Sequence, residues 1–280
     1  MRICTTIADA QNALRGCNRP VGAILTMGAL HEGHLALIRQ ARQECPTVVA
    51  SIYVNPTQFG DQTDLARYPR NIQKDTQILR DEGVDIVFTP TDSEMYPQKF
   101  GTWVEPGPVA RRLEGKQRRK HFRGVCTIVL KLLNVFHPDR SYFGQKDAQQ
   151  IMVIRRMVKD FTLGVNIIAV PTVRENDGLA LSSRNINLSH VERQTAPVLY
   201  RALCLAKELT TRGQVNAFHV RKAMRECIAK ETLANINYVS IADAETLEEL
   251  SAIDRPAVAS LAVTIGTTRL IDNVLLAQAG

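Results

Sequence analysis

Short apolar runs alternate with amphipathic stretches along the first 170 residues of the chain. The apolar runs are rich in Val and Ile, as expected of buried strands, and they cover residues 21–26, 47–54, 85–89, 140–143 and 165–170. Helical spacing of apolar residues predicts helices over 8–14, 35–44, 71–83 and 124–135, and another through Ile151, Ile154 and Met157. This alternation is typical of the α/β class, so we expect a Rossmann-like, doubly wound parallel sheet.

The pattern changes from Ser189, after a polar, hinge-like segment of residues 171–187, and we place a domain boundary in that segment near residue 172. Ser189 and Glu192 have the spacing of a capping box, which marks the start of a helix. Beyond them the spacing predicts helices over 197–212 and 217–231, and strands over 236–242 and 259–266. We therefore expect two domains: a Rossmann-like domain of residues 1–172 and a smaller C-terminal α+β domain of residues 173–280.

The segment Met27-Gly28-Ala29-Leu30-His31-Glu32-Gly33-His34 joins the first convincing strand to a predicted helix. Gly28 and Gly33 carry no Cβ, so the backbone there can come close to a ligand. A helix that starts near His34 would point free N–H groups and the positive end of its dipole at this turn, which suits a phosphate. His31 and His34 would share one face of the first helical turn and could donate hydrogen bonds or protons to a transferring phosphoryl group.

Three interpretations of this HxGH segment stay open at this point. It is either a strand-to-helix turn with two surface histidines or the HxGH signature of the nucleotidyltransferase superfamily, which the class I aminoacyl-tRNA synthetases share. A zinc site is favoured less, because no cysteine pair or third ligand at metal spacing stands nearby.

Other polar groups follow the predicted strands at the same edge of the sheet. Gln58 comes after the second strand and Lys146 after the strand at 140–143. Ligands of open parallel sheets bind beyond the carboxyl ends of the strands, which places both residues beside the histidines, although Gln58 could equally be a capping amide. Ser182-Ser183-Arg184 could wrap a triphosphate and neutralise departing diphosphate, or could be a polar linker.

Composition excludes several classes of protein. The chain has 280 residues with 45% hydrophobic and 22% charged residues, which is ordinary for a globular protein. No apolar run approaches the length of about 20 residues that spans a bilayer, and the N-terminus lacks a secretory signal. The six cysteines are scattered without a CxxC pair. They indicate reduced thiols, so we expect a cytoplasmic protein that does not bind membranes.

The formal net charge of +7 is compatible with binding either nucleic acid or a polyphosphate. The densest basic stretch, 111–123, has little aromatic interleaving beyond Phe122, so the stacking surface of a single-strand binder is missing. Binding of nucleic acid therefore ranks last among the functions considered. The stretch is either a solvated surface loop or a segment that helps to close the site.

Taken together, the motifs resemble those of the pantoate–β-alanine ligase family, also called the pantothenate synthetases. They are, in order, TMGALHEGH, NPTQF, YPRN, EGVD, HFRGV, FGQKDAQQ, PTVRE and DGLALSSRN. The resemblance covers residues 20–190 closely and extends more loosely to the C-terminus. It implies ATP-dependent condensation of pantoate with β-alanine to pantothenate, AMP and diphosphate through a pantoyl adenylate, on the route to coenzyme A.

The resemblance also implies roles for individual residues. His31 and His34 would contact the ATP phosphates, with His34 the usual proton donor, and Lys146 would be the cation at the α- and γ-phosphates. Ser182, Ser183 and Arg184 match the flexible segment that closes on the phosphates. Other positions match the nucleotide site, namely Met27, Gly28, Gly144, Gln145, Asp147, Val173 and Leu181. Pantoate and β-alanine would be held by Gln58, Gln150, Asn55 and Tyr68, while Asp75 matches an acidic position associated with Mg²⁺.

The expected small molecules are therefore ATP, accompanied by Mg²⁺, together with pantoate and β-alanine, in a homodimer that binds no nucleic acid. Two positions depart from the family pattern, since many members have Glu in place of Gln145 and Met in place of Leu181. These changes affect fine tuning rather than activity. The competing enzyme class is a nucleotidylyltransferase, which releases a nucleotidyl product and would give Gln58 and Gln150 no task.

Overall fold

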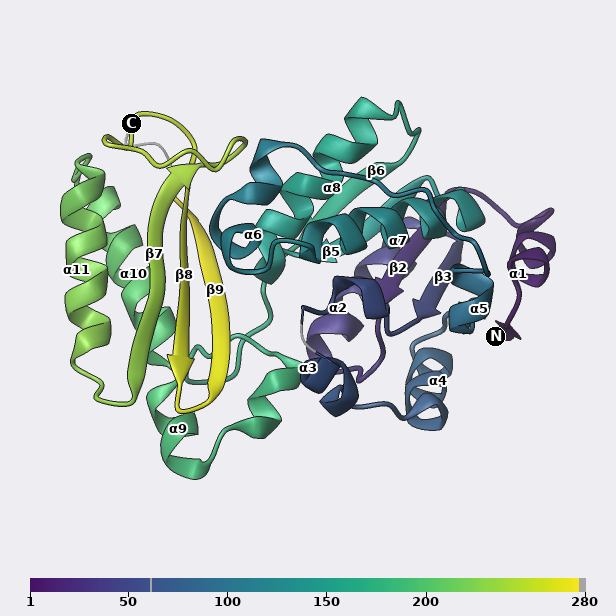
Figure 1. The fold of residues 1–280 in the computed structure, drawn as a ribbon, viewed down its shortest axis with the longest axis horizontal. Coiled ribbons are helices and arrows are strands. Elements are labelled where there is room, and N and C mark those ends of the chain that lie inside the picture. Colours follow the sequence, from purple (N-terminus) through teal and green to yellow (C-terminus); the bar gives the residue numbers. More distant parts are fainter. Residues whose placement is uncertain (61, 277–280) are drawn as a thin grey trace. The chain divides into compact units, whose positions relative to one another are not determined.

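The structure, a computed structural model, describes residues 1–60 and 62–276. Its contacts divide the chain into two compact units, which Figure 1 draws as one ribbon. The first unit contains Met1–Gly144 and Gln149–Pro171, and the second contains Gln145–Ala148 together with the described part of Thr172–Gly280. Four residues from the middle of the first unit's sequence thus pack with the second unit, which nothing in the sequence pattern indicates.

The first unit is built on a parallel sheet of six strands in the order β1-β4-β3-β2-β5-β6. Its strands are β1 Arg2–Cys4, β2 Val21–Thr26, β3 Thr47–Ile52, β4 Ile86–Phe88, β5 Arg140–Gly144 and β6 Asn166–Val170. Every pairing between neighbours is parallel, which confirms the predicted doubly wound α/β class. β1 was not predicted, because three residues are too short to show a period.

Helices cover both faces of this sheet. The helices that lie between β1 and β6 along the chain are α1 Ile7–Leu14, α2 Glu32–Glu44, α3 Gln62–Arg67, α4 Ile72–Asp81, α5 Asp92–Met95, α6 Leu113–Gln117, α7 His121–Phe136 and α8 Ala148–Asp160. Successive residues of β4 face opposite cores: Phe88 packs edge-on against Phe136 of α7, whereas Val87 lies in the cluster that contains Ile38 of α2. This alternation is the period of two that a strand imposes, and it explains why the central strands are apolar throughout.

Several helix boundaries differ from the prediction. The helix expected to start near His34 begins at Glu32, because His31 caps it. The short helices α3, α5 and α6 were not predicted, since four to six residues carry too little periodicity. The basic stretch 111–123 is not an extended loop, because it contains α6 and the first turn of α7, and Gly115 in α6 is buried.

The second unit has an antiparallel sheet of β7 Ala234–Asp243, β8 Ala257–Ile265 and β9 Thr268–Leu276. Helices α10 Val198–Thr211 and α11 Ala217–Ala229 lie side by side along it, and α9 His190–Thr195 precedes them (Figure 1). The predicted capping box is confirmed, since Ser189 and Glu192 exchange hydrogen bonds of 2.7 and 3.4 Å. β9 was not predicted, because buried Asp272 and Asn273 interrupt its apolar pattern.

Candidate site residues also lie in or next to three short 3₁₀ turns, η1 Pro56–Gln58, η3 Gln145–Asp147 and η4 Ser183–Asn187. A fourth turn, η2 Pro108–Arg111, precedes α6. Within the described ranges, the helices are all too short or too polar to cross a bilayer.

Candidate active site

The β2–α2 connection brings the two histidine rings together. His31 adopts an extended backbone and accepts the Gly33 N–H through Nδ1 at 3.1 Å, while His34 Nδ1 accepts the His31 N–H at 3.3 Å. The ring centroids are 4.2 Å apart. A Cβ at Gly33 would stand 2.8 Å from His31 Cε1, so glycine is required there for the ring to occupy its place. The histidines are neighbours because His31 caps the helix, not because both lie on its first turn.

The same hydrogen bonds fix the tautomers of the two neutral imidazoles. A ring nitrogen that accepts a hydrogen bond carries no proton, so the proton of each neutral ring is on Nε2. Both rings stand at the N-terminus of α2, which has thirteen residues and carries the positive end of its dipole there. Two N–H donors and a helix N-terminus together can stabilise negative charge on phosphate oxygens.

Asp75 of α4 holds the backbone of the connection in shape. Its two oxygens accept the N–H groups of Ala29 and Leu30 at 2.9 and 3.0 Å, and the residue is 3% exposed. Gly28 adopts a φ of +81°, and a Cβ there would come within 2.7 Å of Asp75 Oδ2. The carboxylate thus supports the loop that carries the histidines.

These contacts also test the expected metal role of Asp75. Both of its oxygens are engaged by backbone donors, and the side chain is sealed from solvent. No group of three or more His, Cys, Asp or Glu side chains among the described residues could hold a metal ion. Asp75 thus supports the loop in this structure, and its expected role at Mg²⁺ stays a prediction.

Gln58 is held by its neighbours on two sides. Asn55 Nδ2 donates to Gln58 Oε1 at 3.0 Å, and Gln58 Nε2 lies 3.1 Å from the sulfur of Met27. Asn55 is 1% exposed and also donates to the carbonyl of Gly124 in α7 at 3.2 Å. Asn55 is thus a support for Gln58, and the amide orientation of Gln58 is set before any substrate arrives.

The backbone of Gln58 is anchored by the basic stretch. His121 Nδ1 lies 2.8 Å from the Gln58 carbonyl oxygen, and Arg118 donates to the same oxygen at 3.4 Å. Sequence reasoning missed both residues, because the stretch could be judged only as a whole by its charge. Tyr68 lies edge-on to Phe59, the residue after Gln58, at 5.8 Å.

The two adjacent glutamines at the start of α8 differ in their tasks. Gln149 is 7% exposed and holds both α6 and the segment before it: it accepts from Glu114 N of α6 at 3.0 Å and donates to the carbonyls of Val109 and Arg112, each at 2.8 Å. Gln150, the residue assigned to pantoate by the resemblance, is only half-buried. The structure therefore separates a structural amide from one that a ligand can reach.

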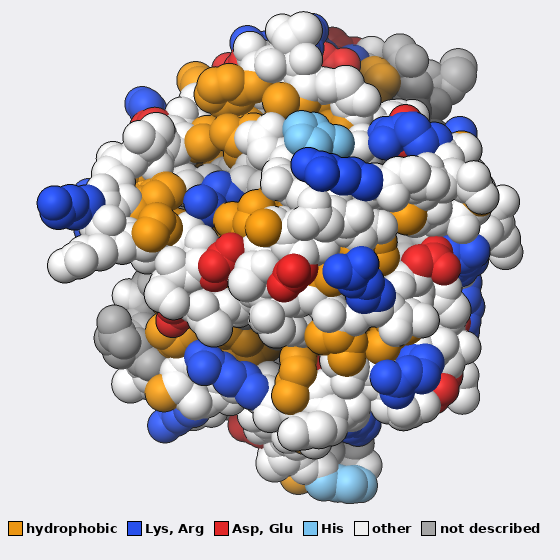
Figure 2. Space-filling model, turned by 90° about the vertical axis from the view of Figure 1, so that its right-hand side faces the viewer, with side chains coloured by type: hydrophobic (Ala, Val, Ile, Leu, Met, Phe, Trp, Pro, Cys, Tyr) orange, Lys and Arg blue, Asp and Glu red, His pale blue; other side chains and the backbone are white. Residues whose placement is uncertain are grey.

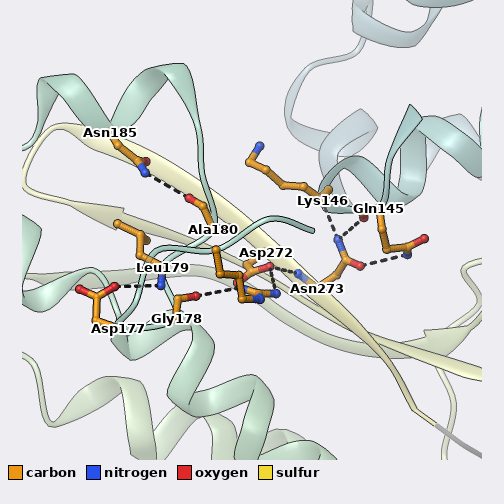
Figure 3. Close-up of polar contacts among 10 residues, drawn as sticks. Gln145, Lys146, Asp177, Gly178, Leu179, Ala180, Asn185, Asp272 and Asn273 are labelled. Atoms are coloured by element: carbon orange, nitrogen blue, oxygen red, sulfur yellow. Dashed lines mark hydrogen bonds and ion pairs between the residues drawn. The ribbon is translucent and has the colours of Figure 1, made fainter. Parts of the chain in front are cut away.

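In the second unit, the η3 turn carries Lys146. Its ammonium lies 3.5 Å from Asp147 Oδ1, and the side chain is 18% exposed. Figure 3 shows the lysine side chain extending away from the hydrogen bonds that hold its backbone. Gln145 donates from Nε2 to Asn273 Oδ1 at 3.2 Å. A glutamate at position 145 has no such donor, which gives the departure at Gln145 a structural consequence.

The segment of Ser182, Ser183 and Arg184 is also in the second unit and is ordered by local bonds. Ser182 caps η4 by accepting the Arg184 N–H at 3.3 Å. Asn185 donates to the Ala180 carbonyl at 3.1 Å (Figure 3), and the N–H of half-buried Leu181 donates to the Val173 carbonyl at 3.0 Å. These contacts place Val173 and Leu181 at the end of one short hairpin, and the Ser-Ser-Arg segment follows it directly.

Charges on the face of the molecule in Figure 2 are interspersed. Lys and Arg side chains are scattered over it, with Asp and Glu beside some of them, and do not gather in one stripe.

The whole chain is similar to proteins of one known family. A family model described as Pantoate-beta-alanine ligase matches residues 2–275. The chain is 52% identical over 276 residues to the pantothenate synthetase of Roseiflexus sp. (strain RS-1), with 99% of each chain covered. It is 51% identical over 281 residues to the pantothenate synthetase of Chloroflexus aurantiacus (strain ATCC 29366 / DSM 635 / J-10-fl), with 100% of each covered.

Two solved structures are also similar to the chain. Pantothenate synthetase from Thermus thermophilus superposes with a TM-score of 0.94 at 45% identity, covering 98% of this chain and 99% of that one. The pantoate–β-alanine ligase from Francisella tularensis, solved in complex with beta-gamma ATP and β-alanine, gives a TM-score of 0.81 at 36% identity, with 98% and 97% covered.

Proposed function

The chain belongs to the pantoate–β-alanine ligase family, and from that premise we propose how its own residues make pantothenate from pantoate, β-alanine and ATP. The observation that carries the proposal is the His31–His34 pair at the N-terminus of α2, where both Nδ1 atoms are acceptors and both Nε2 atoms therefore carry protons. Such a pair can donate to phosphate oxygens while their charge rises.

The reaction has two steps. A carboxylate oxygen of pantoate attacks the α-phosphorus of ATP, the bond from that phosphorus to the bridging oxygen breaks, and diphosphate leaves with the electron pair. The amine of β-alanine then attacks the acyl carbon of the pantoyl adenylate and loses a proton, and AMP leaves as the amide forms. Both steps depend mainly on positioning and on stabilising charge at phosphate oxygens.

We assign the residues as follows. His31 and His34 each donate a hydrogen bond from Nε2 to phosphate oxygens, with His34 the principal donor, and Lys146 neutralises charge at the α- and γ-phosphates. Ser182, Ser183 and Arg184 bind the phosphates and the departing diphosphate. Positions assigned to the rest of the nucleotide are Met27, Gly28, Gly144, Gln145, Asp147, Val173 and Leu181.

Gln58 and Gln150 bind pantoate through neutral amides, which grip hydroxyl and carboxylate groups without adding a competing nucleophile. A substrate without those hydroxyls would leave the amides unpaired, which gives discrimination. Gln58 also lies near β-alanine in this proposal, with Asn55 as its support and Tyr68 at the entrance of the substrate site.

Mg²⁺ accompanies ATP in this proposal, since this ion commonly binds substrate phosphates and would neutralise part of their charge. No step is assigned through Asp75, because its oxygens already support the loop at 29–30. We further propose a homodimer, which sedimentation velocity would test. A cytoplasmic location suits the demand for ATP and the six free thiols.

The experiment measures diphosphate and AMP release from ATP and Mg²⁺ with pantoate, with and without β-alanine. Diphosphate should appear at about one equivalent per site with pantoate alone, and AMP should turn over only when β-alanine is added. Absence of diphosphate release with pantoate would overturn the proposal and favour a nucleotidylyltransferase.

Variants then test the residue assignments. Lys146→Ala and His34→Ala should slow diphosphate release by about 100-fold or more, since each removes stabilisation of the transition state. Lys159→Ala removes an exposed lysine from α8 and is the matched control. Gln58→Ala should weaken use of pantoate far more than use of ATP, and an equal loss for both substrates would contradict the amide assignment.

A further inference from the structure

The turn that carries Lys146 is anchored by a residue from the far end of the chain. Asn273 of β9 donates from Nδ2 to two successive carbonyl oxygens, Gln145 O at 2.9 Å and Lys146 O at 2.8 Å. Its Oδ1 accepts from Gln145 Nε2 at 3.2 Å. Figure 3 shows these three bonds converging on one amide, with the lysine side chain leaving the turn on the other side.

This pattern uses the whole hydrogen-bonding capacity of Asn273 except one lone pair. A side-chain amide has two N–H donors on one nitrogen and a carbonyl acceptor beside it, and all three groups are engaged. Asn273 is 5% exposed, so water cannot replace a lost donor without cost. Aspartate or leucine at this position would leave both carbonyls, those of Gln145 and Lys146, without a donor. Serine has one hydroxyl donor and would leave one of them without a donor.

The neighbouring residue fixes the second candidate segment to the same strand. Asp272 is 3% exposed and accepts from Arg174 through both oxygens, at 2.6 and 2.9 Å. Arg174 also donates to the Gly178 carbonyl at 3.0 Å and stacks on Tyr200, 4.0 Å from the ring centroid. The hairpin of residues 174–180, which leads directly into Ser182, is thus tied to β9.

The contacts of Asn273 and those of Asp272 are also linked to each other. Asp272 Oδ1 accepts the backbone N–H of Asn273 at 2.8 Å, so the carboxylate that holds Arg174 orients the residue that holds the lysine turn. Everything in this network lies within the second unit.

We propose that Asn273 is a positioning residue for Lys146, and that Asp272, through Arg174, holds the Ser182–Arg184 segment in the same frame. The proposal rests on the assignment of Lys146 and this segment to the phosphates of ATP. Asn273 touches no substrate in it, and acts only by fixing the point from which the lysine side chain extends.

The test uses Asn273→Leu and Asn273→Ser, each alone and combined with Lys146→Ala, in the full-length enzyme. The matched control is Asn237→Ala, which removes an exposed asparagine of β7 that accepts from Thr264. Single-turnover diphosphate release with pantoate gives the rate, and titration of each substrate gives KM. Circular dichroism and thermal melts report the fold.

A displaced lysine should lower the rate of diphosphate release by about 10- to 100-fold in Asn273→Leu and by less in Asn273→Ser, which keeps one donor. The KM for pantoate should stay within about twofold, because Gln58 and Gln150 belong to the first unit. In the Lys146→Ala background, the same substitutions should change the rate by less than about twofold, because their effect passes through the lysine.

The outcomes separate this proposal from the proposed function. A normal rate in both Asn273 variants, with a slow Lys146→Ala, overturns the positioning role and leaves the assignment of the lysine intact. A normal rate in Lys146→Ala overturns that assignment instead. Losses that multiply in the double variant, or melts that collapse in both Asn273 variants alone, show that Asn273 serves only the fold and also overturn the proposal.

Discussion

Substitution of Gly124 by alanine should disturb the substrate site from within the core. A Cβ at Gly124 of α7 would lie 2.5 Å from the carbonyl oxygen of Thr57 and 2.7 Å from the backbone nitrogen of Gln58. Both atoms are backbone, so no side chain can rotate away. Ordinary contacts begin at 3.4 Å, so the η1 turn must retreat from α7 by about 0.9 Å, from 2.5 to 3.4 Å.

Two opposing effects set the change in stability. Alanine in a helix interior is favoured over glycine by about 0.8–1 kcal/mol. Overpacking of a filled contact costs about 1–3 kcal/mol. The variant should therefore be destabilised by up to about 2 kcal/mol, and the bond of 3.2 Å from Asn55 to the Gly124 carbonyl should be strained with it.

Catalysis should respond more strongly than stability. Displacement of a substrate-holding residue by close to 1 Å can cost about 100-fold, so kcat/KM for pantoate should fall by about that factor. The assay is diphosphate release at varied pantoate and saturating ATP, and then at varied ATP, whose KM should change by less than about threefold. Gly164→Ala is the control, because a Cβ there meets nothing within 4 Å.

The result that would refute this reasoning is specific. A Gly124→Ala enzyme that is more stable than its parent by about 1 kcal/mol, as helix propensity alone predicts, and that uses pantoate normally would show that η1 does not depend on the close approach of α7.

Three further outcomes are expected. Asp75→Asn replaces one acceptor by a donor facing a backbone N–H, so it should destabilise the protein by about 1–3 kcal/mol in urea unfolding and slow adenylation, and a normal enzyme would contradict its support role. The hydrogen bond from Arg193 holds the pKa of Asp177 below its usual 3.8. The ionised carboxylate therefore stabilises the folded protein fully above about pH 4, and this contribution is lost as the pH falls through the pKa of the folded state. In Asp177→Asn, the free energy of unfolding should accordingly fall less steeply as the pH is lowered below about 4. Burial raises the pKa of Cys126 to about 12, so iodoacetamide at pH 8 should modify exposed Cys204 but not Cys126 in the native protein, as peptide mass spectrometry would reveal.

The central sheet could be predicted from the sequence because its strands carry uninterrupted apolar residues. The run from Val21 needs no knowledge of tertiary contacts to be recognised as a buried strand. β9 could not be predicted in the same way, since Asp272 and Asn273 are polar but buried, and only their partners at Arg174 and Gln145 explain that burial.

The candidate site shows the same division. His31 and His34 lie three residues apart and form a motif, so a local pattern was sufficient to single them out. His121 contacts Gln58 from 63 residues away in the sequence, and the atom that it contacts is the backbone oxygen of Gln58. Every residue type has that oxygen, so the identity of residue 58 could not indicate the contact. Asp75 was assigned by resemblance to a metal, whereas its two backbone contacts can be seen only once the loop at 29–30 is folded.

The anchoring of Lys146 by Asn273 has a consequence for the newborn chain. The two residues are separated by 127 positions, and the asparagine lies in β9, the last strand along the described part of the chain. At about 5–20 residues per second, the lysine turn leaves the ribosome roughly 6–25 seconds before its partner is made. The six-stranded sheet can form in that interval, but the lysine turn must wait. A nascent or prematurely terminated chain that lacks β9 should therefore fold the first unit, which carries Gln58 and Gln150, but should not consume ATP.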